Sequence, residues 1–444
     1  MFVGQRTRGP PSFARSSGPA PLSRRRRREA SGTLGGRPIG SARRPGRDRS
    51  TNRPEVAAVD NPRGTGSGPV YLDYNATTPV DPAVVRACLP YLHEHFGNPS
   101  SRHPYGEAAR AAVADARARV AALVGAEPAE IVFTGGGSDG DTLALRGAAL
   151  AHRRRGTHVV TQVTEHPAVL ENCAALARLH GHRVTRLPVD RHGLVDPADL
   201  AAALTDDTVL VSVMHANNET GTVQPIRELA RLARSRGALF HCDAAQSVGK
   251  IPVSVRELGV DLLSFSGHKL YAPKGVGALY VRAGLALEPS TYGGGQERGL
   301  RGGTENVALI VALGEAARLA GSEGERAGLL RRRDLLHRLL DEHLPGRVTL
   351  NGHPERRLPN TLNISIAGVR ADAVLDAAPG LAASAGSACH EGDDRPSPVL
   401  VAMGADPARA MSALRLSTGR WTGEADVREA AALIADAVRS LPAG

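Results

Sequence analysis

Lys269 stands in a polar turn directly after an apolar run, at the end of the sequence Ser-Phe-Ser-Gly-His-Lys (residues 264–269). A turn of this kind can hold a partly desolvated amine near neutrality, and such an amine adds to a carbonyl carbon to form a Schiff base. Taken alone, the pattern fits a surface lysine at a strand end equally well. Further polar residues at other strand ends favour the Schiff-base interpretation.

Asp243 ends another apolar run, 26 residues before Lys269, and Gln246 follows it closely. A carboxylate in this position can keep the nitrogen of a pyridine ring protonated, and a protonated ring is the electron sink of pyridoxal chemistry. The alternative role is that of a helix cap, which is common for an aspartate at the end of a strand. Together with Lys269, the carboxylate predicts a pyridoxal-type site.

Two further strand ends carry residues suited to a phosphorylated, planar cofactor. Residues 134–138 read Thr-Gly-Gly-Gly-Ser and open a predicted helix, whose first N–H groups and dipole can bind phosphate. Many such glycine-rich turns only reverse the chain. His166 precedes Pro167, which suits a first helical turn. Its imidazole can cover a planar ring, although a histidine at a strand end is often merely hydrogen-bonded.

Candidate anion-binding residues lie later in the chain. Asn218 follows a strand, where an amide can recognise a carboxylate or a hydroxyl. Arg415 lies in the strand-like text Leu-Arg-Leu-Ser and suits a bidentate clamp on a carboxylate, because an arginine in an apolar stretch needs an anion. The glycine-rich segment 293–306, with Arg298 and Arg301 at its centre, predicts an anion-binding loop.

Cys389 is the candidate nucleophile. It lies among small residues in Ser-Ala-Gly-Ser-Ala-Cys-His (residues 384–390), which predicts an accessible thiol, and the neighbouring histidine or a nearby cation favours the thiolate. Cys88, Cys173 and Cys242 fit the alternative role of buried, inert cysteines better. Four widely spaced cysteines suggest neither a disulfide framework nor a structural zinc site, so we expect an intracellular protein without a metal site.

The elements that must position these residues alternate between short apolar runs and helical segments. We expect strands at residues 131–133, 158–163, 209–214, 239–242, 262–265, 278–281 and 361–366. Runs of this kind suit a mostly parallel sheet that is buried on both faces, and the stretches between them have helical spacing. The sequence therefore predicts an α/β fold with ligands at the carboxyl ends of the strands, and a smaller C-terminal α/β domain.

The charge of the chain is confined to its beginning. Residues 1–69 hold fifteen arginines and four acidic residues, which accounts for the whole formal charge of +10 and leaves the remainder close to neutral. This Arg-, Pro- and Gly-rich segment predicts a disordered tail. A solvated tail, an extension from a misplaced start site, and a transit or polyanion-binding arm all remain open. No long apolar stretch predicts a membrane span or a secretory signal, and we expect no nucleic-acid binding by the body of the protein.

Taken in order, these segments resemble the cysteine desulfurases and selenocysteine lyases, which are class V aminotransferase-like enzymes of the fold-type-I pyridoxal-phosphate group. The likeness begins at Tyr-Leu-Asp-Tyr-Asn-Ala-Thr-Thr-Pro (residues 71–79), ends at Arg-Leu-Ser-Thr-Gly-Arg (residues 415–420) and covers nearly all of residues 70–444. Beside the disordered tail expected from composition at residues 1–69, the resemblance implies an N-terminal segment of the small domain, a large cofactor-binding domain and a small C-terminal domain at residues 70–83, 84–326 and 327–444.

The resemblance also implies a role for each residue. Lys269 would carry pyridoxal 5'-phosphate and shuttle protons, while His166 would stack on the ring as an acid or base. Asn218 and Arg415 would hold the carboxylate of L-cysteine or L-selenocysteine, and Cys389 would receive the sulfur as a persulfide and pass it to an acceptor protein. The cofactor itself would be bound by Gly137, Ser138, His166, Asp243, Gln246, Ser266, His268, Lys269 and, from the other subunit of a homodimer, Thr304.

The chain departs from the usual pattern in its glycine-rich turn. The family usually reads Ser-Gly-Gly-Thr-Glu-Ser-Asn-Asn, whereas residues 135–142 read Gly-Gly-Gly-Ser-Asp-Gly-Asp-Thr. Ser138 keeps a hydroxyl, but Asp139 is one methylene shorter than the usual glutamate, and Gly302 replaces a usual serine. The Cys389 loop resembles those of both desulfurases and selenocysteine lyases. Desulfurase is the favoured function and selenocysteine lyase the first alternative; another fold-type-I enzyme and a non-catalytic binding protein are the others. We expect a cytoplasmic enzyme, and the pathway that uses the sulfur, such as iron–sulfur cluster assembly, stays open.

Overall fold

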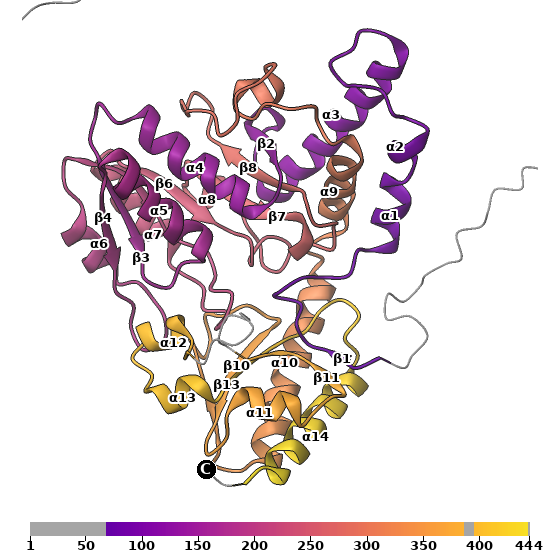
Figure 1. Ribbon diagram of the computed structural model, residues 1–444, viewed down its shortest axis with the longest axis vertical. Helices are drawn as coiled ribbons and strands as arrows, with labels where there is room; N and C mark the ends of the chain where they lie inside the picture. Colours follow the sequence, from indigo (N-terminus) through magenta and orange to yellow (C-terminus); the bar gives the residue numbers. More distant parts are fainter. Residues whose placement is uncertain (1–67, 386–394, 443–444) are drawn as a thin grey trace, which may run out of the picture. The chain divides into compact units, whose positions relative to one another are not determined.

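The computed structural model describes residues 68–385 and 395–442. The tail expected at residues 1–69 lies almost entirely outside this part of the chain, and so does Cys389. The described residues form two main sheets, a seven-stranded sheet with a hydrophobic core on each face and a four-stranded sheet with a core of its own. Figure 1 shows the first with its covering helices in indigo to salmon and the second in orange to yellow.

The large sheet has the strand order β2-β8-β7-β6-β5-β3-β4, and only β8 runs against its neighbours. Strands β3 to β7 therefore end at the same edge, where the sequence placed its polar residues. β4 was not predicted, because it lies at the edge of the sheet and is largely exposed. The strands are β2 (Ile131–Thr134), β3 (His158–Gln162), β4 (Arg183–Leu187), β5 (Thr208–Ser212), β6 (Leu239–Asp243), β7 (Leu262–Ser266) and β8 (Gly277–Val281).

Helices cover both faces of this sheet, as the continuous apolar runs predicted. Successive residues of a strand point to opposite faces, so Val159 packs in the core under α4 and α5, and Val160 packs in the core under α3, α7 and α9. The helices are α1 (Pro82–Cys88), α2 (Pro90–His93), α3 (Pro104–Val124), α4 (Gly137–Ala151), α5 (Pro167–His180), α6 (Pro197–Ala203), α7 (Ile226–Ser235), α8 (Val255–Leu258) and α9 (Val307–Leu319).

The smaller sheet is antiparallel, with the order β12-β13-β10-β9, and a parallel pair β1-β11 lies beside it. Residues from both ends of the described chain build its core, since Val70 and Leu72 pack with Leu336 of α10 and Ile434 of α14. The elements are β1 (Val70–Tyr71), α10 (Glu323–His343), β9 (Val348–Leu350), β10 (Thr361–Ile366), α11 (Ala371–Asp376), β11 (Leu381–Ala382), β12 (Ser384–Ala385), α12 (Pro398–Ala402), α13 (Pro407–Met411), β13 (Ala413–Ser417) and α14 (Glu424–Ser440).

The two sheets are joined by the segment that follows β1. Asn75 is 1% exposed and bonds to both sides: its N–H donates to Ser417 Oγ of β13 over 2.9 Å, and its main-chain oxygen accepts from Gln246 Nε2 over 3.0 Å. Its side-chain amide donates to Thr361 Oγ1 of β10 over 2.9 Å.

Within the described ranges no helix is both long and apolar enough to cross a bilayer.

Candidate functional site

Lys269 ends a short 3-10 turn, η2 (Gly267–Lys269), directly after β7. Its ammonium donates to the main-chain oxygens of Asn75 and Ala76 over 2.5 and 2.6 Å. Burial and, to a lesser extent, the charge of Arg415 lower the pKa of Lys269 to about 8, against the opposing effect of the carboxylates of Asp73 and Asp243. The surroundings therefore bring this amine close to neutrality, as a Schiff-base lysine requires.

Asp243 is the last residue of β6 and is 6% exposed. One carboxylate oxygen accepts the N–H of Ala245 over 2.9 Å, so the aspartate does cap a local turn. Burial raises the pKa of Asp243, while the bond to Ala245 and the charges of His166 and Lys269 hold it down. The carboxylate combines the turn-capping role with burial beside two basic groups of the site.

Gln246 is buried and both ends of its amide are engaged. Its Nε2 donates to the main-chain oxygen of Asn75 over 3.0 Å, and its Oε1 accepts from the ammonium of Lys250 over 2.7 Å. The NH2 group has a second hydrogen, which is available to a ligand hydroxyl. Gln246 therefore lies in the same hydrogen-bonded cluster as Lys269, with Asn75 between them.

His166 caps α5, and Pro167 stands in the first helical turn as predicted. The imidazole Nδ1 accepts the N–H of Ala168 over 3.1 Å, which leaves Nε2 to carry the proton of the neutral ring. Desolvation lowers the pKa of His166, although the residue is exposed in the open site; Asp243 opposes the shift and Lys269 adds to it. The neutral form also suits the positive end of the helix dipole.

The glycine-rich turn leads from β2 into the N-terminus of α4. Gly136 has φ +147°, a conformation that favours glycine, and as N-cap it has no side chain to satisfy the first helical N–H groups. A Cβ on Gly277 would lie 2.8 Å from the carbonyl carbon of Gly136, so the turn packs closely on β8. Ser266 lies next to Gly137, since a Cβ there would be 3.6 Å from that of Ser266. The turn is shaped to receive an anion.

Asp139 closes this turn despite its short side chain. Its Oδ2 accepts the N–H of Gly135 over 2.6 Å and binds the Nε of Arg301 over 2.7 Å. Arg298 donates to the main-chain oxygen of Ile131 over 3.0 Å. Both arginines of the segment 293–306 thus bind groups of this chain, and Arg301 braces the glycine-rich turn; the interpretation of the segment as an anion-binding loop stays a prediction.

Two other predicted phosphate ligands flank this region. Ser138 is exposed in the first turn of α4, and the Nδ1 of His268 lies 3.1 Å from the hydroxyl of Thr77. Thr304 is also exposed, on the segment that Arg301 holds. Ser138 at the start of α4 and His268 in η2, next to Lys269, lie at the same edge of the large sheet, whereas Thr304 remains a prediction for a second subunit.

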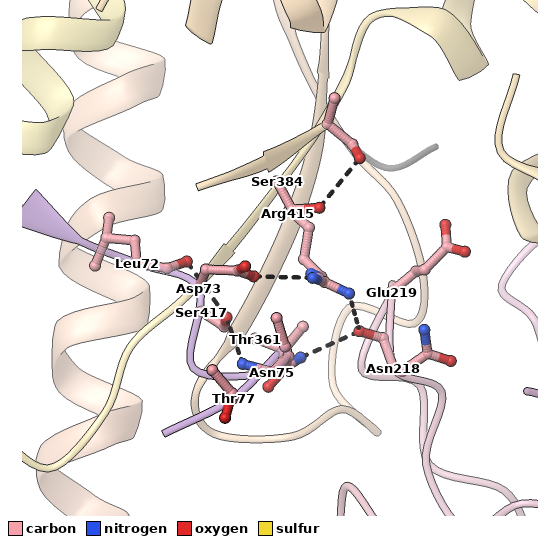
Figure 2. Close-up of polar contacts among 12 residues, drawn as sticks. Leu72, Asp73, Asn75, Thr77, Asn218, Glu219, Thr361, Ser384, Arg415 and Ser417 are labelled. Carbon is pink, nitrogen blue, oxygen red and sulfur yellow. Dashed lines mark hydrogen bonds and ion pairs between the residues drawn. The ribbon is translucent and has the colours of Figure 1, made fainter. Parts of the chain in front are cut away.

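Arg415 lies on β13 and faces the segment after β1 (Figure 2). Its Nη2 binds Oδ1 of Asp73 over 2.8 Å, and its Nη1 donates to the main-chain oxygen of Asn218 over 3.2 Å. The anion that an arginine in an apolar stretch requires is thus Asp73, a residue of the chain itself. Asn218 meets Arg415 through its backbone, and that same oxygen accepts the amide of Asn75 over 3.2 Å.

The position of Cys389 lies outside the described residues, but the chain enters its segment beside this arginine. Ser384 of β12 is paired with Arg415 of β13, five residues before Cys389 (Figure 2). The other cysteines, Cys88, Cys173 and Cys242, are buried, and burial raises the pKa of each thiol, that of Cys173 to about 12. Burial favours the protonated, unreactive form, in agreement with the inert role expected of them.

The class V aminotransferase family model matches residues 70–429 of this sequence. The chain belongs to the class V aminotransferase family. The sequence is 49% identical over 378 residues to "Cysteine desulfurase IscS" of Anaeromyxobacter sp. (strain Fw109-5), covering 84% of this chain and 93% of that protein. It is 46% identical over 363 residues to the protein of the same name from Dictyoglomus turgidum, covering 81% and 91%.

Solved structures give the same family assignment. A "NIFS-LIKE PROTEIN" superposes with a TM-score of 0.77 at 36% identity, over 84% of this chain and all of that one. "SspA in complex with cysteine" superposes with a TM-score of 0.72 at 36% identity, over 80% and 99%. DndA from Streptomyces lividans gives 0.66 at 39%, over 77% and 97%. The predicted family and the fold-type-I α/β fold are confirmed.

The residues fit pyridoxal phosphate, the cofactor of class V aminotransferases. The open N-terminus of α4 with Ser266 beside it suits the phosphate, and the buried carboxylate of Asp243 suits a protonated ring nitrogen. Lys269 supplies an amine near neutrality for the aldehyde. The three groups come from different elements, α4, β6 and η2, which the parallel sheet brings to one edge.

Two residues of this class V site were missed by sequence reasoning. Asn75 lies in the motif at residues 71–79, but its role as the junction between Lys269, Gln246 and the small sheet depends on contacts that no spacing shows. Lys250 gave a usable signal, since the chain has only three lysines among its 55 basic residues. A chain that otherwise uses arginine keeps one of those lysines 8% exposed, next to Gln246.

Two buried acidic residues, Asp141 and Glu165, lie near Asp243 of the class V cofactor site. Asp141 contacts the hydroxyl of Ser264 and lies 3.6 Å from Nε2 of His241. Burial raises the pKa of Asp141, and the charge of Asp243 raises it further. Glu165, next to His166 in sequence, accepts the N–H of Met214 over 2.6 Å, and burial raises its pKa to about 8. Burial disfavours the charged form of both, whereas the N–H of Ala245 and the charges of His166 and Lys269 favour the charged form of Asp243.

Proposed function

We propose that this chain is a pyridoxal-phosphate-dependent cysteine desulfurase, which converts L-cysteine to L-alanine and places the sulfur on Cys389 as a persulfide. The observation that carries the proposal is the near-neutral amine of Lys269 and its link to Arg415. The amine donates to Asn75, and the side chain of Asn75 donates to the main-chain oxygen of Asn218, which also accepts from Arg415. A Schiff-base amine and a carboxylate-binding group in one site describe an enzyme that acts on amino acids. The cysteine desulfurases among the relatives define which amino acid.

In this proposal Arg415 binds the carboxylate of the substrate, and Asn218 positions Arg415 through its main-chain oxygen. When bound, pyridoxal phosphate supplies an electron sink for the charge that develops at the substrate Cα. Lys269, with a pKa of about 8, can take the Cα proton and return a proton to the product. The Nε2 of His166 carries a second proton, besides that of Lys269, which the site can exchange with the substrate.

The sulfur transfer needs no outside oxidant or reductant. The thiolate of Cys389 attacks the sulfur of cysteine, a sulfur–sulfur bond forms, and the carbon–sulfur bond breaks with its electron pair moving to carbon. A proton then completes L-alanine, and Cys389 holds one additional sulfur atom. L-selenocysteine is the competing substrate, since a selenol is more acidic than a thiol and needs less help from a protein nucleophile.

We also propose a homodimer to which Thr304 contributes across the interface. Large apolar side chains are exposed around α1, α2 and the start of α3, where Phe96 and Tyr105 stack with ring centroids 5.4 Å apart. Leu92 is 65% exposed and Phe96 is 69% exposed, which is unusual for a surface that stays in water. Light scattering tests the dimer. Thr304→Ala is expected to weaken cofactor binding without dissociating the dimer.

A persulfide on a protein must be handed on, so we propose an acceptor protein with a nucleophilic thiol as partner. The few widely spaced cysteines support a cytoplasmic location. Incubation of the enzyme with labelled cysteine and a candidate acceptor, followed by mass measurement of the acceptor, tests the transfer.

The decisive experiment combines absorption with product analysis. Purified protein is expected to bind pyridoxal phosphate with a visible band that Lys269→Ala abolishes and the exposed-lysine control Lys274→Ala keeps. Alanine, sulfide and selenide are then measured from cysteine and selenocysteine with wild type and Cys389→Ser. Loss of cysteine turnover alone supports a desulfurase. Turnover of selenocysteine but not cysteine by wild type indicates the lyase, and turnover of neither rejects both.

A further inference from the structure

The guanidinium of Arg415 is already occupied by groups of the chain itself (Figure 2). Nη2 binds the carboxylate of Asp73 over 2.8 Å, and Nη1 donates to the main-chain oxygen of Asn218 over 3.2 Å. The Nε is buried without a hydrogen-bond partner among the residues that the structure describes. The side chain of Arg415 is 11% exposed and that of Asp73 is 22% exposed, so water screens the pair only partly.

The carboxylate of Asp73 is separable from the structural role of the residue. The main-chain oxygen of Asp73 accepts the N–H groups of Ala76 and Thr77 and the hydroxyl of Tyr71, and these bonds shape the turn after β1. The side-chain carboxylate instead makes the ion pair with Arg415. An asparagine at this position keeps the backbone bonds and the side-chain shape while it removes the charge.

A substrate carboxylate that binds Arg415 must therefore meet a second carboxylate. A guanidinium offers five N–H donors in a fixed fork, and a carboxylate binds best when it takes two parallel donors. Asp73 takes one donor of Nη2. Whether the substrate displaces Asp73 or shares the guanidinium with it, two like charges compete for one cation at short range, which weakens the binding of either.

We propose that Asp73 is an internal competitor for the substrate carboxylate and so limits the affinity of the site for amino acids, an inference that rests on Arg415 as the carboxylate-binding residue of the proposed desulfurase. The ion pair between Asp73 and Arg415 stabilises the protein when no substrate is bound, because a buried guanidinium without an anion is costly. The opposed effects of Arg415 and Asp73 on the pKa of Lys269 show that both charges reach the reacting amine. Asp73 is in these terms a positioning residue that acts through Arg415.

Asp73→Asn tests the proposal by steady-state kinetics of the holoenzyme. We expect the KM for L-cysteine to fall by about tenfold, the change that corresponds to 1.4 kcal/mol of binding free energy. The inhibition constant of the product L-alanine is expected to fall by a similar factor. Binding of cysteamine, which has no carboxylate, is expected to stay within about twofold of wild type, because it does not compete with Asp73.

Three variants separate this role from a structural one. Asp73→Glu retains the charge and is expected to keep a KM close to that of wild type. Asp81→Asn breaks a comparably buried pair, in which Oδ2 of Asp81 lies 2.5 Å from Arg420, and is expected to lower the melting temperature without lowering the KM. Should Asp73→Asn fail to fold, Asp73→Ser removes the same charge in a smaller side chain.

The outcomes distinguish the inference from the function on which it rests. If wild type releases no alanine from cysteine, the proposed function fails. If wild type is active and the KM of Asp73→Asn is unchanged or higher, or cysteamine gains as much as cysteine, Asp73 is no competitor and the inference is overturned.

Discussion

The ammonium of Lys250 donates to Oε1 of Gln246 over 2.7 Å and to Oδ1 of Asn75 over 3.2 Å. An ammonium can only donate hydrogen bonds, so the amide oxygen of Gln246 must face Lys250 and its NH2 group must face Asn75 and the site. Burial lowers the pKa of Lys250, and the charges of Lys269 and Arg415 add to this effect. A second buried lysine thus fixes the donor direction of the residue expected to hold the cofactor hydroxyl.

Replacing Lys250 by methionine is therefore expected to weaken cofactor binding by about tenfold, since the amide of Gln246 loses one of the two hydrogen bonds that orient it. Fluorescence titration of the cofactor-free protein with pyridoxal phosphate measures the dissociation constant. The matched control is Lys274→Met, because Lys274 is exposed. Equal dissociation constants for the two variants would contradict the orienting role of Lys250.

The rate at which cofactor-free protein takes up pyridoxal phosphate is expected to follow the ionisation of Lys269. Only the neutral amine adds to an aldehyde, so the rate should rise about tenfold per pH unit and level off near pH 8, the lowered pKa, instead of near 10.5. Stopped-flow absorption at a series of pH values gives the midpoint. In Arg415→Gln the midpoint should move upward, because a cation that lowers the pKa is lost; a midpoint above pH 10 in wild type would refute the assignment.

Glu165 makes the stability of the protein depend on pH in a direction opposite to that of most carboxylates. Burial raises its pKa from 4.5 to about 8. Between these values the folded protein holds a proton that the unfolded chain has lost, so the contribution of Glu165 to stability decreases as pH rises, by up to about 1.4 kcal/mol per pH unit. This contribution is fully present below pH 4.5 and is lost once the pH has passed about 8.

Glu165→Gln is expected to remove this dependence, because glutamine cannot ionise and its amide oxygen can still accept the N–H of Met214. Urea unfolding at several pH values between 5 and 8 measures the free energy of unfolding. The variant should gain stability relative to wild type as the pH increases. Parallel curves for the two proteins would show that Glu165 does not hold a proton in the folded state.

A buried ion pair between Arg117 and Glu297 supports a turn at Glu297 and Arg298, within the segment 293–306. Both carboxylate oxygens of Glu297 bind Arg117, over 2.6 and 2.8 Å, and one also accepts the N–H of Phe133 over 2.9 Å. Glu297 and Arg298 have φ values of 46° and 57°, a strained conformation for residues other than glycine. The pair ties this strained turn to α3, while the bonds of Glu297 to Phe133 and of Arg298 to Ile131 tie it to β2.

Glu297→Gln is expected to destabilise the protein by about 3 kcal/mol, because it leaves the Arg117 charge without its partner in a place where the carboxylate is 4% exposed. Glu424→Gln breaks the exposed helical pair with Arg428 and should cost less than about 0.5 kcal/mol. Denaturant unfolding of both variants provides the comparison. Similar small losses would mean that the strained turn does not depend on Glu297.

Local patterns in the sequence predicted the strands of the large sheet because the side chains of a doubly covered strand are apolar whatever their partners are. β6 and β7 began at the predicted residues, and Asp243, the last residue of β6, lies at the same edge of the sheet as Lys269, which follows β7. The edge strand β4 escaped prediction because its exposed residues carry no such signal. Strand ends therefore located the candidate site, but not its internal bonds.

The sequence by itself determined the chemistry that the residues could perform: a lysine after a buried strand, a carboxylate after another, an arginine in an apolar stretch and a thiol among small residues. Tertiary structure decided which charges meet. Asp73 and Arg415 are 342 residues apart in sequence, and Asn75 bridges β10, β13 and the loop after β6. Side-chain pairing over such distances follows from how the two sheets pack against the segment after β1, and no local spacing encodes it.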